Sequence, residues 1–260
     1  MSATTARRRR ALRRGAGLAA LVILLAWAVG RARGLDQSTQ ATDPLFRWEY
    51  LLVRDRTPDE LWARTREHLE LTVVPVVLGT ILSAGLAALV LRFRVLQSTV
   101  FTLAGALYTI PSLALFGILS TYNSNWTSAV IALTTYTLLI ITRNIVAGID
   151  AVPRDALDAA DGLGMSRRQR LLTVELPLAT PIILTGIRVA TVTTVGLVAI
   201  SRVIQLGGLA SYVFDGYNRD YSTTIILGSV AMVLLAVSLD LGLRGIERLL
   251  TLWSRRAAAR

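Results

Sequence analysis

The stretch Asp158-Ala159-Ala160-Asp161-Gly162-Leu163-Gly164, followed after nine residues by Val174-Glu175-Leu176-Pro177, is a polar segment between long apolar runs. Pro153 fits the first turn of a helix, and Ser166 can cap a second helix beyond the glycines. Gly162 and Gly164 permit positive φ angles, and Pro177 is expected to end the second helix. The sequence therefore predicts two short helical pieces with small surface side chains, of a size to sit in a groove on a partner protein.

The composition indicates a membrane protein. Hydrophobic residues make up 53% of the 260 residues and charged residues only 17%, which is too apolar for a soluble domain. The net charge of +11 does not indicate a nucleic-acid partner, because the arginines cluster at the ends of apolar runs rather than along one face. Without cysteine, the chain can have no disulfide, thiolate metal site or cysteine nucleophile.

Six apolar runs approach the ~20 residues that a helix needs to cross a hydrocarbon core of ~30 Å. These runs are 16–30, 71–91, 95–119, 126–141, 178–200 and 223–243. Lipid offers no partner for unpaired backbone groups, so each run is expected to be helical. The predicted fold class is an all-α membrane protein, a polytopic bundle of about six transmembrane helices.

Arginine placement predicts the orientation, because basic residues close to span ends stay preferentially in the cytoplasm. Four arginine-rich segments alternate with the spans, namely 7–14, 92–94, 143–170 and 244–260. Both termini and the polar segment are therefore expected on the cytoplasmic side. The segments 122–125 and 201–222 are expected outside.

Two features before the second run have separate interpretations. The run 16–30 ends near Ala26-Trp27-Ala28 and suits either a retained anchor or a cleaved signal peptide. Residues 58–69 follow Thr57, a good N-cap, and carry apolar side chains on one side, which predicts an interfacial helix on the outer leaflet. His68, the only histidine, is expected to pack or to form a hydrogen bond there.

The spacing of acid-Ala-Ala, three residues, Gly, nine residues and aliphatic-any-Leu-Pro resembles the EAA loop by which permeases of ATP-binding-cassette (ABC) importers dock on their ATPase. Asp158 stands where that family usually has Glu, and Val174 where it usually has Ile. The resemblance implies a type I ABC importer permease whose cytoplasmic loop, 143–177, couples to the ATPase. The coupling residues it implies are Ala156, Leu157, Asp158, Ala159, Ala160, Leu163, Gly164, Val174, Leu176 and Pro177.

A longer part of the chain, roughly 58–250, looks like the osmoprotectant permeases. The resembling segments are 67–69, 108–116, 143–144, 175–179, 186–188 and 207–209 with Phe214. That family imports glycine betaine, choline, carnitine or related compounds such as proline betaine, by alternating access. Residues 1–57 lie outside the resemblance as an N-terminal extension with an extra span, and 251–260 form a basic tail. The segment 201–205 departs from the small apolar residues expected there, and leaves the cargo open.

The resemblance also implies partners. They are an ABC ATPase dimer, a second permease subunit of the same or a paralogous chain, an extracytoplasmic substrate-binding protein, and lipid of the bacterial cytoplasmic membrane. No cofactor is expected on this chain, which has no lysine and hence no Gly-Lys-Ser/Thr phosphate loop. ATP and Mg²⁺ would bind to the partner ATPase.

Arg188 lies well inside the run 178–200, where a charge costs at least ~2.5 to 3.5 kcal/mol unless it pairs or meets water. Asp240 is the only carboxylate within an apolar run and is the expected partner, with Arg244 as its competitor. Such a pair would brace the gate. The alternative is that each side chain snorkels to the interface.

Aromatic faces suit a quaternary ammonium cargo, and Tyr108, Phe116, Tyr122 and Tyr136 are the candidates on the third and fourth runs. Tyr108 precedes Pro111, where a broken helix would expose backbone to a cavity. Tyr108, Pro111 and Ser112 are therefore the expected pathway residues.

Two other function classes fit less well. An intramembrane enzyme would need paired acids, a histidine cluster or a nucleophile beside a base. An ion-gradient-driven transporter would normally show internal repeats and several midplane charges, and it would leave the polar loop unexplained. The expected function is a permease subunit and not an enzyme, with an ABC permease for an amino acid or another amine as the alternative.

Overall fold

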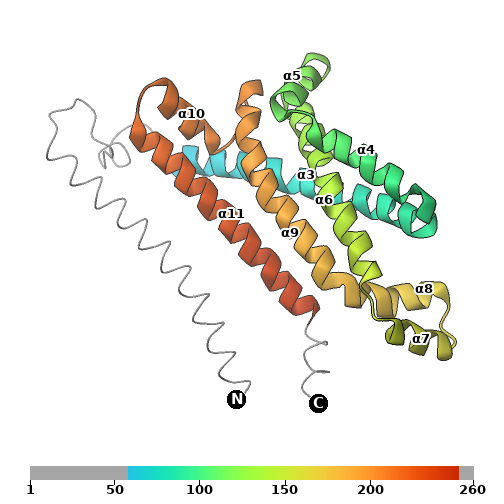
Figure 1. Cartoon of the computed structure of the whole chain (residues 1–260). Helices are drawn as coiled ribbons and strands as arrows, with labels where there is room; N and C mark the ends of the chain where they lie inside the picture. Colours follow the sequence, from blue (N-terminus) through green and yellow to red (C-terminus); the bar gives the residue numbers. More distant parts are fainter. Residues whose placement is uncertain (1–57, 252–260) are drawn as a thin grey trace, which may run out of the picture.

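The computed structural model describes residues 58–251, and within that range the chain is helical without a β-strand (Figure 1). Four helices are long and apolar enough to cross a membrane. They are α3 (Pro58–Arg92), α6 (Asn125–Asp150), α9 (Leu176–Ile200) and α11 (Ser222–Leu250). They confirm four of the predicted spans, whereas the run 16–30 and the tail from 252 lie outside the described residues.

α3 joins two segments that were expected to be separate. The predicted interfacial helix at 58–69 and the span at 71–91 form one continuous helix, so that prediction is wrong. No glycine, proline or capping side chain interrupts the junction, and the pair Arg66 Nε–Glu70 Oε1 (2.7 Å) links successive turns there. His68 is buried beside it, with Nε2 3.1 Å from the Val195 carbonyl oxygen of α9, and thus packs and hydrogen-bonds as expected.

The third apolar run is broken rather than straight. After a short turn, η1 (Arg94–Leu96), it forms α4 (Gln97–Thr109) and α5 (Ser112–Tyr122), which meet at Pro111 with a bend of 88°. Proline lacks the backbone donor that would continue the helix. The Tyr136 hydroxyl of α6 donates to the Ile110 carbonyl at 2.6 Å and so satisfies an acceptor at the break. The expected kink at Pro111 is therefore confirmed as a complete break.

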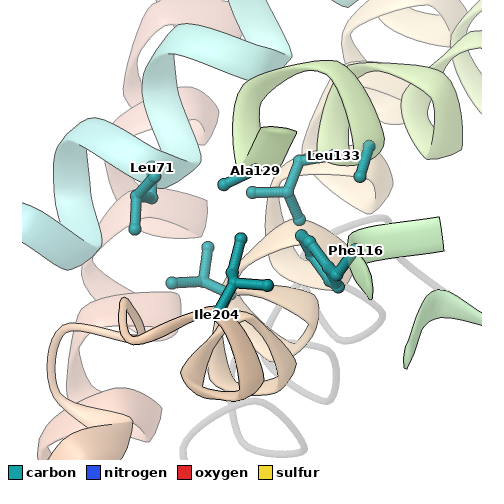
Figure 2. Close-up of a cluster of buried hydrophobic side chains, with 7 residues drawn as sticks. Leu71, Phe116, Ala129, Leu133 and Ile204 are labelled. Carbon is teal, nitrogen blue, oxygen red and sulfur yellow. The ribbon is translucent and has the colours of Figure 1, made fainter. Parts of the chain in front are cut away.

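α6 is the central helix of the bundle. In its most apolar stretch 61% of residues are buried, against 6% in α11. It packs between α3 and α9, and α9 packs in turn against α11, so that α6, α9 and α11 lie side by side in Figure 1. A core cluster joins α3, α5, α6, α9 and the turn η3 (Ser201–Ile204) (Figure 2). Its members include Leu71, Phe116, Leu133, Val198 and Ile204.

The helix directions gather the basic segments at one end. α7 (Arg154–Gly162) and α8 (Arg167–Arg170) lie at the same end as the C-terminus of α11, and α5 and α10 (Ala210–Asn218) lie at the opposite end (Figure 1). Arg94 of η1 binds the Asp150 carboxylate, at the end of α6, with contacts of 2.6 and 3.1 Å. The arginines of 92–94, 143–170 and 244–248 thus share one end of the bundle, as their alternation along the chain predicted.

Close helix contact depends on particular glycines. A Cβ at Gly186 of α9 would collide with the Asn144 side chain of α6, and one at Gly79 of α3 would collide with Thr137. Small residues let helix backbones approach closely in membrane proteins. Gly79 makes such a close contact, whereas Gly85, Gly105 and Gly117 have open space beside them within residues 58–251.

We expect Gly186→Ala to destabilise the protein by about 1 to 3 kcal/mol, because the added methyl group overpacks the α6–α9 contact. The matched control is Gly196→Ala on the same helix, where the added Cβ meets nothing within 4 Å. Thermal unfolding in detergent measures the difference. Equal melting temperatures for the two variants would contradict the close contact.

Candidate coupling site

The polar segment folds as the sequence predicted at its start. α7 (Arg154–Gly162) begins directly after Pro153. The chain turns back at Gly164, whose φ of +71° favours glycine. Gly162 stays within the helix, so of the two glycines only Gly164 adopts the positive φ that both permit. The Gly164 amide donates to the Asp161 carbonyl at 3.0 Å, which closes the turn.

The expected coupling residues divide between two faces. Ala160 is buried, at 2% exposure, and faces the protein. Leu163, at the tip of the turn, is 76% exposed, among the most exposed large apolar side chains of residues 58–251. The remaining residues are half-buried or exposed: Ala156, Leu157, Val174, Leu176 and Pro177 are half-buried, and Asp158, Ala159 and Gly164 are exposed.

The second short helix leads into α9 without a break. Ser166 caps α8 (Arg167–Arg170) in a capping box with Gln169, which confirms the predicted cap. A π-helical turn, η2 (Leu171–Glu175), then connects α8 to α9, and Pro177 lies in the first turn of α9. The prediction that Pro177 ends the helix is therefore wrong. The π turn widens the hydrogen-bond spacing just before the proline, where its missing donor is tolerated.

Arg170 ties α7 to the start of α9. Its Nη1 donates to both carboxylate oxygens of Asp161, at 2.7 and 2.8 Å, and its Nε donates to Glu175 Oε1 at 2.9 Å. Charge-assisted bonds of this kind fix the relative orientation of the bonded groups as well as stabilising their contact. The two helical pieces and α9 therefore form one connected unit.

This bridge was not predicted from the sequence. In an α-helix, Arg170 and Glu175 would point in different directions, because neighbours on one face are three or four residues apart. The π turn has a longer repeat and brings the two side chains together. The signal that could have found the bridge is the pair of acids, Asp161 and Glu175, on either side of a single arginine.

Arg188 meets Asp240 inside the bundle, as the sequence suggested. Arg188 Nε lies 2.8 Å from Asp240 Oδ1, and both side chains are about four-fifths buried (19% and 20% exposed). Two further charges join them: Arg188 Nη1 lies 3.3 Å from Glu247 Oε2, and Arg244 Nε lies 2.8 Å from Asp240 Oδ2. The four residues form a neutral inner charge cluster between α9 and α11.

Glu247 was missed because it lies beyond the apolar run that ends at 243. The helix continues to Leu250, and Glu247 follows Asp240 by seven residues, which places both acids on one face after two turns. The inner charge cluster thus extends from the span into the last turns of α11.

The pathway candidates lie elsewhere, at the break in the third run. The rings of Tyr108 and Tyr136 meet edge to face with centroids 5.9 Å apart, and Pro111 and Ser112 form the bend itself. Phe116 is buried in the core and Tyr122 is 83% exposed, so the four aromatic candidates do not form a cage. α4 and α11 lie on opposite sides of α6 and α9 in Figure 1, which separates these residues from the inner charge cluster.

Comparison with known proteins identifies the class of protein to which this chain belongs. Residues 76–252 match the family described as binding-protein-dependent transport system inner membrane component. The osmoprotectant import permease protein OsmW of Salmonella typhimurium is 37% identical over 193 residues, 72% of this chain and 90% of that protein. The glycine betaine/carnitine/choline transport system permease protein OpuCB of Bacillus subtilis is 34% identical over 193 residues, 74% and 89%.

Among solved structures, an inward-facing MetNI methionine ABC transporter matches with a TM-score of 0.68 and 20% identity, covering 76% of this chain and all of that chain (100%). The family match, the relatives and the fold together define a permease subunit of an ABC importer, which confirms the predicted fold class. The chain belongs to the binding-protein-dependent transport system inner membrane component family. It is a multi-pass transport subunit rather than an enzyme, since a separate subunit hydrolyses ATP in this family.

A neutral double-mutant cycle tests the inner charge cluster. A charge swap would be misleading, because it would put an acid beside Glu247 and a base beside Arg244. We expect Arg188→Gln and Asp240→Asn each to lower stability and uptake, and the double variant to be less harmful than their sum by about 0.5 to 3 kcal/mol.

The matched control for this cycle is Arg248→Gln, on the exposed side of α11 and without an ion pair to any residue of 58–251. It should leave stability and uptake near wild type. Thermal unfolding and uptake rates measure the cycle. Strictly additive effects would contradict a working Arg188–Asp240 interaction.

Proposed function

We propose that this chain and a second permease subunit, of the same or a paralogous sequence, form the membrane pathway of an ATP-driven importer of small quaternary amines. Glycine betaine, choline, carnitine and proline betaine belong to this class. The relatives named for osmoprotectant and for glycine betaine, carnitine and choline transport support it, at 34 to 37% identity. The family match spans both the coupling site and the inner charge cluster.

In this proposal the ATPase binds at α7. Leu163 would enter a groove on the ATPase, with the exposed Asp158 and Ala159 beside it. Small side chains on that face would let the two backbones approach closely. The single observation that carries the proposal is this solvent-exposed leucine, held at the tip of a closed turn.

In this proposal, movement of the ATPase is transmitted mechanically through α7 to α9. Helical structure runs from Arg167 to Ile204 for 38 residues, roughly 57 Å at ~1.5 Å per residue. With α7 fixed to it through Arg170, a displacement of α7 would move the far end of α9. Only a stiff element with two stable positions can turn ATPase closure into alternating access.

The proposed topology puts the α7–α8 end in the cytoplasm, because the arginine-rich segments gather there. The chain would lie in the bacterial cytoplasmic membrane with both termini inside. The substrate-binding protein would dock at the opposite end, near α5 and α10. ATP and Mg²⁺ would bind to the ATPase dimer, with no cofactor on this chain and no nucleic-acid partner.

Reconstituted uptake tests the function and the coupling together. Proteoliposomes with the permease, its ATPase and its binding protein should import labelled glycine betaine or choline only with ATP inside. Gly164→Pro should abolish uptake while ATP is still hydrolysed. Proline cannot adopt the φ of +71° at Gly164 and removes the amide that bonds to Asp161.

Gly162→Ala is the matched control, since Gly162 is helical and has open space beside it. It should transport at the wild-type rate. Normal ATP-driven uptake by Gly164→Pro would refute the coupling role. Uptake of an amino acid but of no quaternary amine would refute the cargo class, and uptake without the ATPase would refute the importer.

A further inference from the structure

A pocket of about 540 Å³ opens between α5, η3 and α10, at the end opposite to the coupling site. Its walls are mostly apolar and include Leu113, Ile200, Val203 and Phe214. Small-molecule sites typically occupy ~300 to 1,000 Å³ and combine apolar walls with a few polar groups. Leu113 lies in the first turn of α5, directly after the break at Pro111, so the pocket adjoins a discontinuous helix.

Arg202 alone is charged among the described residues that line this pocket. Its Nη2 lies 3.4 Å from Asp215 Oδ1, and Asp215 is not part of the wall. This is a long, single contact, and the guanidinium makes no other hydrogen bond to a residue of 58–251. An arginine has five N–H donors in a planar fork, so those that remain suit a carboxylate.

The backbone that carries Arg202 is fixed in place. Ile204 is anchored in the core cluster of Figure 2, and the Gln205 amide donates to the Arg202 carbonyl at 3.0 Å. Gln205 has a φ of +66°, which is strained for a residue with a side chain. Gly207 packs so closely that an added Cβ would lie 3.2 Å from the Arg202 Cβ. Such strain is typical of functional sites.

The positive charge of Arg202 in the pocket wall would discriminate among quaternary amines. Glycine betaine and carnitine carry a carboxylate besides the ammonium group, whereas choline carries a hydroxyl and a net positive charge. A carboxylate would bind the free donors of Arg202, and an aromatic face such as that of Phe214, 40% exposed, suits the ammonium group. A carboxylate-free cation would meet the repulsion of Arg202 without that compensation.

We propose that this pocket is a cargo site of the permease itself, in which Arg202 binds the carboxylate and Phe214 the ammonium group of a betaine. The site makes the permease selective for zwitterionic betaines over choline. This inference rests on the proposed function and narrows its cargo class.

The test is direct binding to the purified permease–ATPase complex without the binding protein, because that protein would impose its own selectivity. Labelled glycine betaine and choline are the probes. Wild type should bind glycine betaine at least tenfold more tightly than choline. Arg202→Gln should weaken glycine betaine binding by about tenfold, the loss of one charge-assisted contact, and leave choline binding no weaker.

Two further variants separate recognition from folding. Asp215→Asn removes the competing internal carboxylate and should tighten glycine betaine binding, which a merely structural role of the pair would not produce. Arg202→Gln with Asp215→Asn leaves no unpaired acid and should still lose glycine betaine. Arg219→Gln, exposed at the end of α10 and outside the pocket, is the matched control and should bind like wild type.

Equal binding of glycine betaine by wild type, Arg202→Gln and the double variant would overturn the site. So would choline binding as tight as that of glycine betaine in wild type. If the wild-type importer takes up quaternary amines while these binding results fail, only the pocket proposal falls. If it takes up no quaternary amine at all, the proposed function falls with it.

Discussion

Arg170 donates to Asp161 on α7 and to Glu175 on η2, and this one side chain joins the coupling helix to the span that follows it. Without it, no side-chain ion pair between residues of 58–251 would join α7 to the start of α9, and the Gly164 turn would be their direct chain connection on that side. Charge-assisted bonds in two directions make the junction stiff as well as attached. The bridge in turn requires the π-helical turn, which aligns Glu175 with Arg170.

The continuous helical structure from Arg167 to Ile204, which contains α9, connects three places that would otherwise be separate. From the coupling site it passes the inner charge cluster at Arg188 and reaches the pocket at Arg202. α11 is the least enclosed of the four long helices. The inner charge cluster holds the C-terminal half of α11 to α9. A movement that enters at α7 therefore has a continuous physical route to α11 and to the pocket wall, which is what coupled transport requires.

Much of this architecture could be predicted from the sequence, because lipid demands long apolar helices and arginine marks their ends. Those constraints are local, and they gave the spans at α3, α6, α9 and α11 and the cap at Ser166. The failures depended on tertiary contacts or altered helix geometry. The break at Pro111 was predicted, but the bond from Tyr136 of another helix to the Ile110 carbonyl there was not, and the Arg170–Glu175 contact needs a π turn. Glu247 was missed because hydropathy does not mark where a helix ends.

The most direct measurement is of distances within and between subunits. The chain has no cysteine, so spin labels can be placed at Ala159→Cys on α7 and Val203→Cys beyond α9 without background labelling. In the assembled importer, ATP should change the distance between the two α7 helices of the permease dimer. The Ala159–Val203 distance within one subunit should stay constant. A within-subunit distance that changes as much as the one between subunits would contradict the rigid connection on which the account rests.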